Sequence, residues 1–198
     1  MRLTEYKTEC IAIAKKTFWI NPAYDTVLAV QKLYKEDLED WEKLDQALKM
    51  FVINDAGLKR LSWKQKAELL EEIYNKFIND DDKCPIEHDS VPILDFELDS
   101  DYIFSSFFLD YGIDLLNERG KMSWERFIAL FRGLSDHTKI REVMRIRKMD
   151  VPEYNGKNQK KIQDILKLKS YYALPVRNNS GQSGLSDLFD KLEKVAMS

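Results

Sequence analysis

Apolar residues recur every three or four positions along most of the chain, which is the spacing of one face of an α-helix. Between residues 38 and 77 this spacing predicts two amphipathic helices, separated by a turn at 54–57. Their inward positions are Leu38, Trp41, Leu44, Leu48, Phe51, Val52, Trp63, Ala67, Leu70, Ile73, Tyr74 and Phe77. Ser62 and Gln65 have the spacing of a capping box, in which each side chain bonds the other's backbone N–H, so the second helix is expected to begin there.

The first 20 residues depart from the helical spacing. Residues 9–14 and 17–20 are short apolar stretches on either side of a lysine pair, Lys15 and Lys16, a pattern typical of two strands around a tight turn. Asn21 and Pro22 then supply a helix start, because Asn is a good N-cap and Pro lacks an N–H that the first helical position does not need. We therefore predict a small N-terminal β-hairpin followed by a helix.

The central region predicts further helices. After an acidic run at 95–101, apolar residues cover nearly every face of one helix: Tyr102, Ile103, Phe104, Phe107, Phe108, Leu109 and Tyr111. Such a helix must be buried on most sides, in its own domain or against a partner, and Gly112 ends it. Two shorter helices are expected to begin near Ser123 and Ser135, and a basic helix is expected at 157–172.

Prolines and charge runs divide the chain into five predicted segments. They are a hairpin and helices at 1–78, an acidic proline-containing linker at 79–94, a central helical unit at 95–175, a flexible linker at 176–184 and an amphipathic C-terminal helix at 185–198. The fold class that follows is a predominantly α-helical bundle with a small N-terminal β-hairpin.

The composition also indicates in which compartment the protein is expected. Hydrophobic residues make up 44% and charged residues 33% of the chain, which is typical of a folded protein. Cys10 and Cys84 form no disulfide framework of the secreted type, and no apolar stretch approaches the length of a signal core or of a bilayer span. A soluble, intracellular protein without a membrane segment is expected.

Charge is distributed unevenly along the chain. Residues 80–101 carry nine acids and one base, whereas residues 119–169 carry fourteen bases and six acids. This asymmetry favours self-association or an internal acidic-on-basic contact, with Arg141, Arg145 and Lys148 as candidate self-association residues. It suits nucleic acid less well, because the nearby acids would repel phosphate.

Catalytic and metal-binding chemistry has little support. Carboxylates alternate along 95–101 as in a calcium loop, but Ser100 and Ser106 stand where that loop needs glycine and a bidentate glutamate. A solvated or N-capping acidic run at a helix start is the better explanation. Cys10, Cys84, His88 and His137 form no short ligand pair, and the chain has neither a nucleophile motif nor a glycine-rich phosphate loop. We expect no enzyme activity, no metal and no cofactor.

Two interpretations of the aromatic and basic helices remain open. The aromatic residues are most simply core, but some of them could line a protein-binding groove, the candidates being Tyr102, Phe107, Phe108, Tyr111, Trp124 and Phe127. The basic helices at 139–169 could instead contact phosphate, which gives the alternative of a small nucleic-acid-binding or regulatory protein.

Ordered motifs in the central region carry a family resemblance. The stretches DFELDSDYIF at 95–104, DYGIDL at 110–115 and MSWERFIALFRGLS at 122–135 resemble a family of long-tailed, siphovirus-type bacteriophage proteins. Its members are tail-assembly chaperones encoded just ahead of the tape-measure gene. The similarity continues through 145–147 and 171–175 and, more loosely, 18–24. Glu125 is a departure, because in the family a second aromatic often accompanies the residue matching Trp124.

The resemblance implies a role in holding other proteins. The chain would bind the tape-measure protein, keep it soluble and help to recruit tail-tube subunits, and it would also contact copies of itself. It would act in the host cytoplasm and be absent from the mature virion. The resemblance implies a role without a catalytic site or a cofactor, and the charge pattern makes nucleic acid an unlikely partner.

Overall fold

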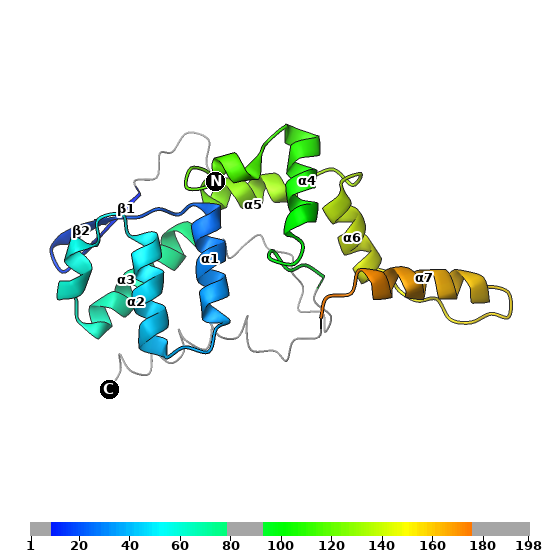
Figure 1. Cartoon of the computed structure of the whole chain (residues 1–198), viewed down its shortest axis with the longest axis horizontal. Helices are drawn as coiled ribbons and strands as arrows, with labels where there is room; N and C mark the ends of the chain where they lie inside the picture. The colour runs from blue at the N-terminus through cyan, green and yellow to red at the C-terminus, as the bar shows by residue number, and fades with distance from the viewer. Residues whose placement is uncertain (1–8, 79–92, 176–198) are drawn as a thin grey trace. The chain divides into compact units, whose positions relative to one another are not determined.

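The computed structural model describes residues 9–78 and 93–175, which Figure 1 shows as coloured ribbons. These residues form seven α-helices and a small N-terminal antiparallel hairpin, which confirms the predicted fold class. No helix among them is long and apolar enough to cross a membrane. The predicted segments 176–184 and 185–198, and all of 79–94 except its last two residues, lie outside the described residues. The five-segment division therefore stays a prediction.

Contacts group the described residues into two compact units. The first, here called the hairpin unit, comprises residues 9–78 and 118–129. The second, called the α4 unit, comprises residues 93–117 and 130–175. The boundary between the two falls inside one helix, α5 (Trp124–Arg132).

The hairpin unit begins with β1 (Cys10–Ile13) and β2 (Lys16–Trp19), which pair antiparallel with Ile11 opposite Phe18. Ala14 and Lys15 form the two-residue turn, and both have positive φ, at 51° and 61°. A turn of this kind matches the twist of the strands that it joins. The hairpin is thus confirmed, with Lys16 in the second strand and not in the turn.

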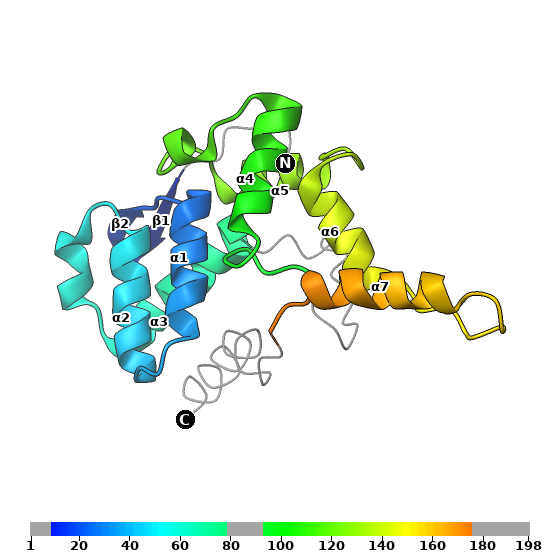
Figure 2. The same ribbon diagram turned by 45° about the vertical axis from the view of Figure 1, so that its right-hand side comes forward.

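Three helices complete most of this unit: α1 (Tyr24–Tyr34), α2 (Asp40–Phe51) and α3 (Trp63–Ile73). A 3₁₀ turn, η1 (Asp55–Arg60), precedes α3, and a π-helical turn, η2 (Tyr74–Ile78), follows it. In Figure 2, α2 lies beside both α1 and α3. The predicted capping box is present, since Ser62 Oγ accepts from the backbone N–H of Gln65 and Gln65 Oε1 accepts from that of Ser62.

Two details of the predicted pattern are wrong in this unit. Helix α1 begins at Tyr24 with Ala23 as N-cap, because Asn21 Oδ1 accepts from the N–H of Ala23 instead of capping a helix that contains Pro22. Trp41 and Trp63, expected to point inward, are exposed, since both lie in the first turn of a helix where solvent is available. The core itself follows the pattern, with Val27, Leu44, Leu48, Phe51, Leu70 and Ile73 fully buried.

A distant segment joins the hairpin unit through α1. The N–H of Tyr24 donates to the carbonyl of Met122, and the N–H of Trp124 donates to that of Pro22. The rings of Tyr24 and Phe127 stack with their centroids 4.8 Å apart. Residues 118–129 are therefore part of this core although 25 described residues, 93–117, belong to the other unit and precede them.

The α4 unit is built on α4 (Ser100–Tyr111), α6 (Lys139–Lys148) and α7 (Gln159–Tyr171), with a 3₁₀ turn, η3 (Leu115–Glu118), after α4. Helix α6 packs against both α4 and α7. Gly112 ends α4 as predicted, in a left-handed conformation with φ of 63° that places its N–H on the carbonyl of Phe108.

A buried arginine ties the parts of the α4 unit together. The guanidinium of Arg147 donates two parallel hydrogen bonds to the carboxylate of Asp99, at 2.6 and 2.8 Å. It also donates to the backbone carbonyls of Ile93 and Tyr172. Lys169 in turn donates to the carbonyl of Arg147. One side chain on α6 thus fixes the start of α4 and the end of α7.

Candidate protein-binding site

Polar contacts on its inner side set the orientation of α4. Ser106 Oγ accepts from the N–H of Ile140 at 3.1 Å and so joins the middle of α4 to the start of α6. The carboxylate of Asp110 accepts from both the N–H and the hydroxyl of Ser135, and the Tyr111 hydroxyl donates to the carbonyl of Leu130. Together with Asp99, these contacts fix which face of α4 is turned outward.

The outward face of α4 is apolar. Phe108 is 58% exposed and Leu109 is 69% exposed, while Phe104 is partly exposed. The rings of Phe104 and Phe108, one helical turn apart, are nearly parallel, with centroids separated by 6.5 Å. We call these three residues the α4 strip. Exposed apolar clusters of this kind on a structured helix are typical of protein-binding surfaces.

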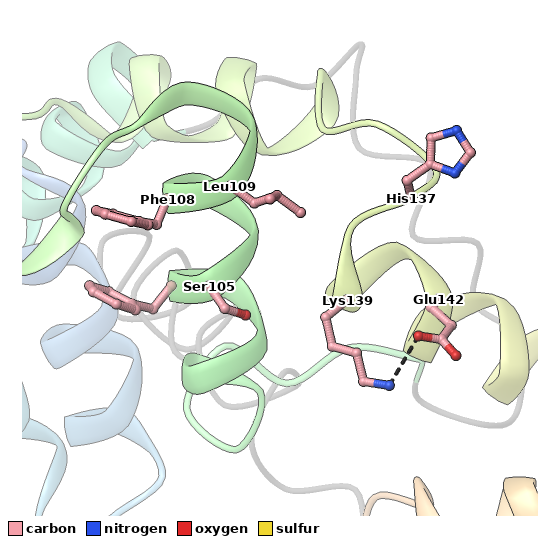
Figure 3. A pocket seen from close by; sticks show the side chains of 7 residues that line it. Ser105, Phe108, Leu109, His137, Lys139 and Glu142 are labelled. Carbon is pink, nitrogen blue, oxygen red and sulfur yellow. Dashed lines mark hydrogen bonds and ion pairs between the residues drawn. The ribbon is translucent and has the colours of Figure 1, made fainter.

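A hollow of about 460 Å³ adjoins the α4 strip. Figure 3 shows Ser105 and Leu109 projecting from α4 toward the segment that carries His137 and Lys139. Phe108 projects from another side of the same helix. The remaining lining comes from Phe104 and from Glu142 on α6. The hollow therefore has one apolar wall and one polar wall, which is the arrangement that fits an amphipathic segment.

The polar wall carries an ion pair between Lys139 and Glu142. Lys139 Nζ donates to the Tyr172 hydroxyl at 2.8 Å and to Glu142 Oε2 at 3.0 Å, and it lies 5.0 Å from the centroid of the Tyr172 ring. The hydrogen bond to Tyr172, and then that to Glu142, raise the pKa of Lys139 to about 12. The ammonium group therefore stays charged over the whole physiological pH range.

The acidic run before α4 has a structural explanation. Asp95 Oδ1 accepts from the N–H groups of Glu97 and Leu98, which closes a turn, and Asp99 is the N-cap residue whose carboxylate pairs with Arg147. Within residues 9–78 and 93–175, no group of three or more His, Cys, Asp or Glu side chains could hold a metal ion. Cys84 and His88 lie outside the described residues.

The six predicted protein-binding residues lie in different environments. Phe107 is fully buried, Tyr102 and Tyr111 are partly exposed and Phe108 is largely exposed, all four on α4. Trp124 and Phe127 are buried in the hairpin unit, with their rings stacked on each other. Phe108 is thus the one of the six that presents most of its side chain to solvent, and the binding role of the set stays a prediction.

The three predicted self-association residues also differ. All lie on α6, where Arg145 and Lys148 are exposed. Arg141 is partly buried, and its guanidinium donates to the carbonyl of Arg132 within the α4 unit. Arg141 therefore has a role inside its own unit, while self-association through these residues stays a prediction.

Sequence reasoning missed several residues of the site. Phe104 and Leu109 line the hollow together with Phe108, although of these three the sequence indicates only Phe108 as a candidate. His137, Lys139 and Glu142 complete the hollow. The sequence does contain one sign of this surface. Apolar residues cover nearly every face of α4, so faces that its own domain does not bury need a binding partner.

Comparisons with known proteins place the chain among phage proteins. A family model described as Bacteriophage Gp15 protein matches residues 5–174. No curated protein and no solved structure matches the chain.

Proposed function

Because the chain belongs to the Bacteriophage Gp15 protein family, we propose that it is a tail-assembly chaperone that binds the tape-measure protein and keeps it soluble. The proposal also includes a part in recruiting tail-tube subunits, contact with further copies of the chain, and action in the host cytoplasm without incorporation into the virion. The role is one of binding, without a catalytic step.

The observation that carries the proposal is the α4 strip. A long helical client exposes apolar stripes that aggregate unless something covers them, and a groove with an apolar wall covers such a stripe by the helix-in-groove mode. Covering the exposed parts of Phe108 and Leu109 would contribute about 1–2 kcal/mol each. The ion pair of Lys139 and Glu142 beside the strip would offer a cation and a carboxylate to polar groups that flank the client's stripe.

The hydrogen-bonded frame of α4 also supports this role. Buried Asp99 and Ser106 and exposed Asp110 hold the helix by hydrogen bonds, so its apolar outer face would be available without rearrangement. A preformed surface binds with a smaller loss of conformational entropy than one that must be assembled during binding.

Co-expression with a tape-measure protein tests the proposal. The wild-type chain should raise the soluble fraction of that client, and Phe108→Ser should abolish most of the effect. Tyr154→Ser is the matched control, since this aromatic residue is also exposed in the α4 unit but does not line the hollow. The control variant should protect the client as well as the wild type does.

Two results would contradict the proposal in different ways. An insoluble client in the presence of wild-type chain would reject the chaperone role, and equal protection by Phe108→Ser would reject the α4 strip as its surface. A gel shift with DNA or RNA that weakens steeply with salt would instead favour the nucleic-acid-binding alternative.

A further inference from the structure

Helix α7 leaves most of its side chains in contact with solvent. Of its thirteen residues only Ile165 is buried. Near its C-terminal end two apolar residues are exposed, Leu168 to 44% and Tyr171 to 77%. Because residues three positions apart lie on one side of a helix, these two form a single patch, which we call the α7 end. The α4 unit thus has a second exposed apolar surface besides the α4 strip.

The α7 end is a neighbour of the hollow beside the α4 strip. The ring of Tyr171 meets that of Tyr172 edge to face, with the two centroids 4.8 Å apart. The hydroxyl of Tyr172 accepts a hydrogen bond from Lys139 Nζ at 2.8 Å, and Lys139 lines the hollow. The two apolar surfaces are therefore joined through Tyr172 and Lys139, within one unit of the chain.

Charges of opposite sign accompany the two surfaces. Asp101 is exposed on α4, three positions before Phe104 and seven before Phe108, and so lies on the side of the helix that carries the α4 strip. Lys167 is exposed on α7, four positions before Tyr171, and so lies on the side that carries the α7 end. Among residues 9–78 and 93–175, neither Asp101 nor Lys167 forms an ion pair.

The whole helices differ in charge in the same sense. Helix α4 contains two aspartates and no base, a net charge of -2. Helix α7 contains four lysines and one aspartate, a net charge of +3. A contact between α4 and α7 would therefore bring opposite charges together, whereas a contact of either helix with its own equivalent would bring like charges together.

Tyr171 fits the hollow chemically. The hollow, of about 460 Å³, has an apolar wall formed by the α4 strip and a polar wall with Lys139 and Glu142. A tyrosine side chain has the same two parts, an apolar ring and a hydroxyl group, which is why tyrosine is common at interfaces. Within one copy the two do not meet, since Tyr171 is not among the residues that line the hollow.

A second copy of the chain can bring them together. Two complementary surfaces that are neighbours on one molecule can be paired by a two-fold axis, which places each surface on the other surface of a second copy. Both contacts then form in the same event, so two contacts that are weak alone give one stable association.

From this arrangement we propose that two copies of the chain bind each other through their α4 units, with the α7 end of each copy seated on the α4 strip of the other. Lys167 of one copy pairs with Asp101 of the other, beside the apolar contact. The inference rests on the proposed function, because the same strip receives the client. Client and second copy therefore compete, and self-association covers the strip until the client replaces it.

Sedimentation equilibrium of the full chain, without client, tests the apolar contact. The wild type should show an equilibrium between monomer and dimer. Tyr171→Ser and Phe108→Ser should each weaken the dimer at least tenfold, because each removes an aromatic side chain from both contacts. Tyr154→Ser is the matched control, since this exposed tyrosine precedes α7 and does not line the hollow. Its dimer should stay within twofold of the wild type, with equal far-ultraviolet circular dichroism for all.

A charge exchange tests which surfaces meet. Lys167→Glu and Asp101→Lys each bring like charges together in both contacts, so each variant alone should dimerise at least fivefold more weakly than the wild type. In an equimolar mixture of the two variants, a mixed dimer has opposite charges in both contacts. The mixture should therefore dimerise within twofold of the wild type, which only a contact between different copies can produce.

Several results would overturn the proposal. A wild-type chain that stays monomeric at its highest soluble concentration would reject self-association, and an equal loss in the Tyr171 and Tyr154 variants would reject the location. A mixture as weak as the single variants would reject the pairing of Lys167 with Asp101, and species larger than a dimer would reject the two-fold arrangement.

Client solubility separates this inference from the proposed function. Tyr171→Ser should protect the client at least as well as the wild type, because it frees the α4 strip without altering it. If this variant lost protection and still dimerised, the α7 end would be part of the client site and the inference would be wrong. A monomeric wild type that protects the client would leave the proposed chaperone role standing.

Discussion

The two units are stabilised in different ways. In the hairpin unit twenty-five apolar side chains are buried, whereas in the described part of the α4 unit nine are. The four buried polar or charged residues of the described chain all belong to the α4 unit: Asp99, Ser106, Thr138 and Arg147. Apolar burial alone accounts for the buried side chains of the first unit, whereas the second combines a smaller apolar core with buried polar contacts.

This difference bears on function. Helix α4 buries Ile103 and Phe107, and the hydrogen bonds of Ser106 and Asp110 add directed contacts to this packing. Phe108 and Leu109 are not needed for either and stay exposed. The α4 unit is therefore sensitive to substitution, because the loss of one partner in a buried ion pair leaves the other charge uncompensated.

The largest effect is expected from Arg147→Met. This change leaves the Asp99 carboxylate buried without its cation and removes the ties to Ile93 and Tyr172, so the free energy of unfolding should fall by about 3–5 kcal/mol. Chemical denaturation measures the loss, and hydrogen exchange should locate it in the α4 unit. Arg145→Met, an exposed arginine on the same helix, is the control, and an equal loss in both variants would contradict the comparison.

An intermediate effect is expected in the hairpin unit from Gly57→Ala. A Cβ at this position would lie 2.8 Å from Cε1 of Phe18, whose ring is buried and cannot move away freely. The overpacking should lower the free energy of unfolding by about 1–3 kcal/mol. The double variant with Phe18→Leu measures the coupling. If the two losses simply add, the clash is not the cause.

The smallest effect is expected from Asp45→Asn. Hydrogen bonds from Lys49 on the same helix and Lys66 on α3 lower the pKa of the Asp45 carboxyl. A depressed pKa in the folded state stabilises the protein above the unfolded pKa of about 4, and this contribution disappears as pH falls through the folded pKa. The variant should lose about 0.5 kcal/mol at pH 7. In thermal denaturation its difference from the wild type should vanish near pH 2, and a difference that persists there would contradict this account.

The local elements could be predicted from the sequence because their causes are local. The β-hairpin follows from short apolar strands around a two-residue turn, and the start of α3 from the Ser62 and Gln65 pair. The end of α4 follows from the freedom of Gly112 to adopt positive φ. In each case the residues that determine the structure lie within a few positions of one another.

The candidate site could be predicted only in part. The sequence indicated that α4 has too many apolar faces for one core, and it named Phe108 among the candidates. It did not distinguish Phe108 from Phe107, which is adjacent in sequence but fully buried. The choice depends on which face of the helix is held by Ser106 and Asp110, and their partners Ile140 and Ser135 come from distant parts of the chain.

The sequence by itself therefore determined the helical class, the hairpin, most helix ends and, through its ordered motifs, the resemblance to phage proteins. Only the tertiary structure decided that Asp99 pairs with Arg147, 48 positions away, that the α4 strip faces outward, and that residues 118–129 join the core of the hairpin unit. The physical reason is that propensity, capping and turn geometry act over a few residues. Burial and long-range pairing depend on which segments meet, and this is decided by the packing of the whole unit.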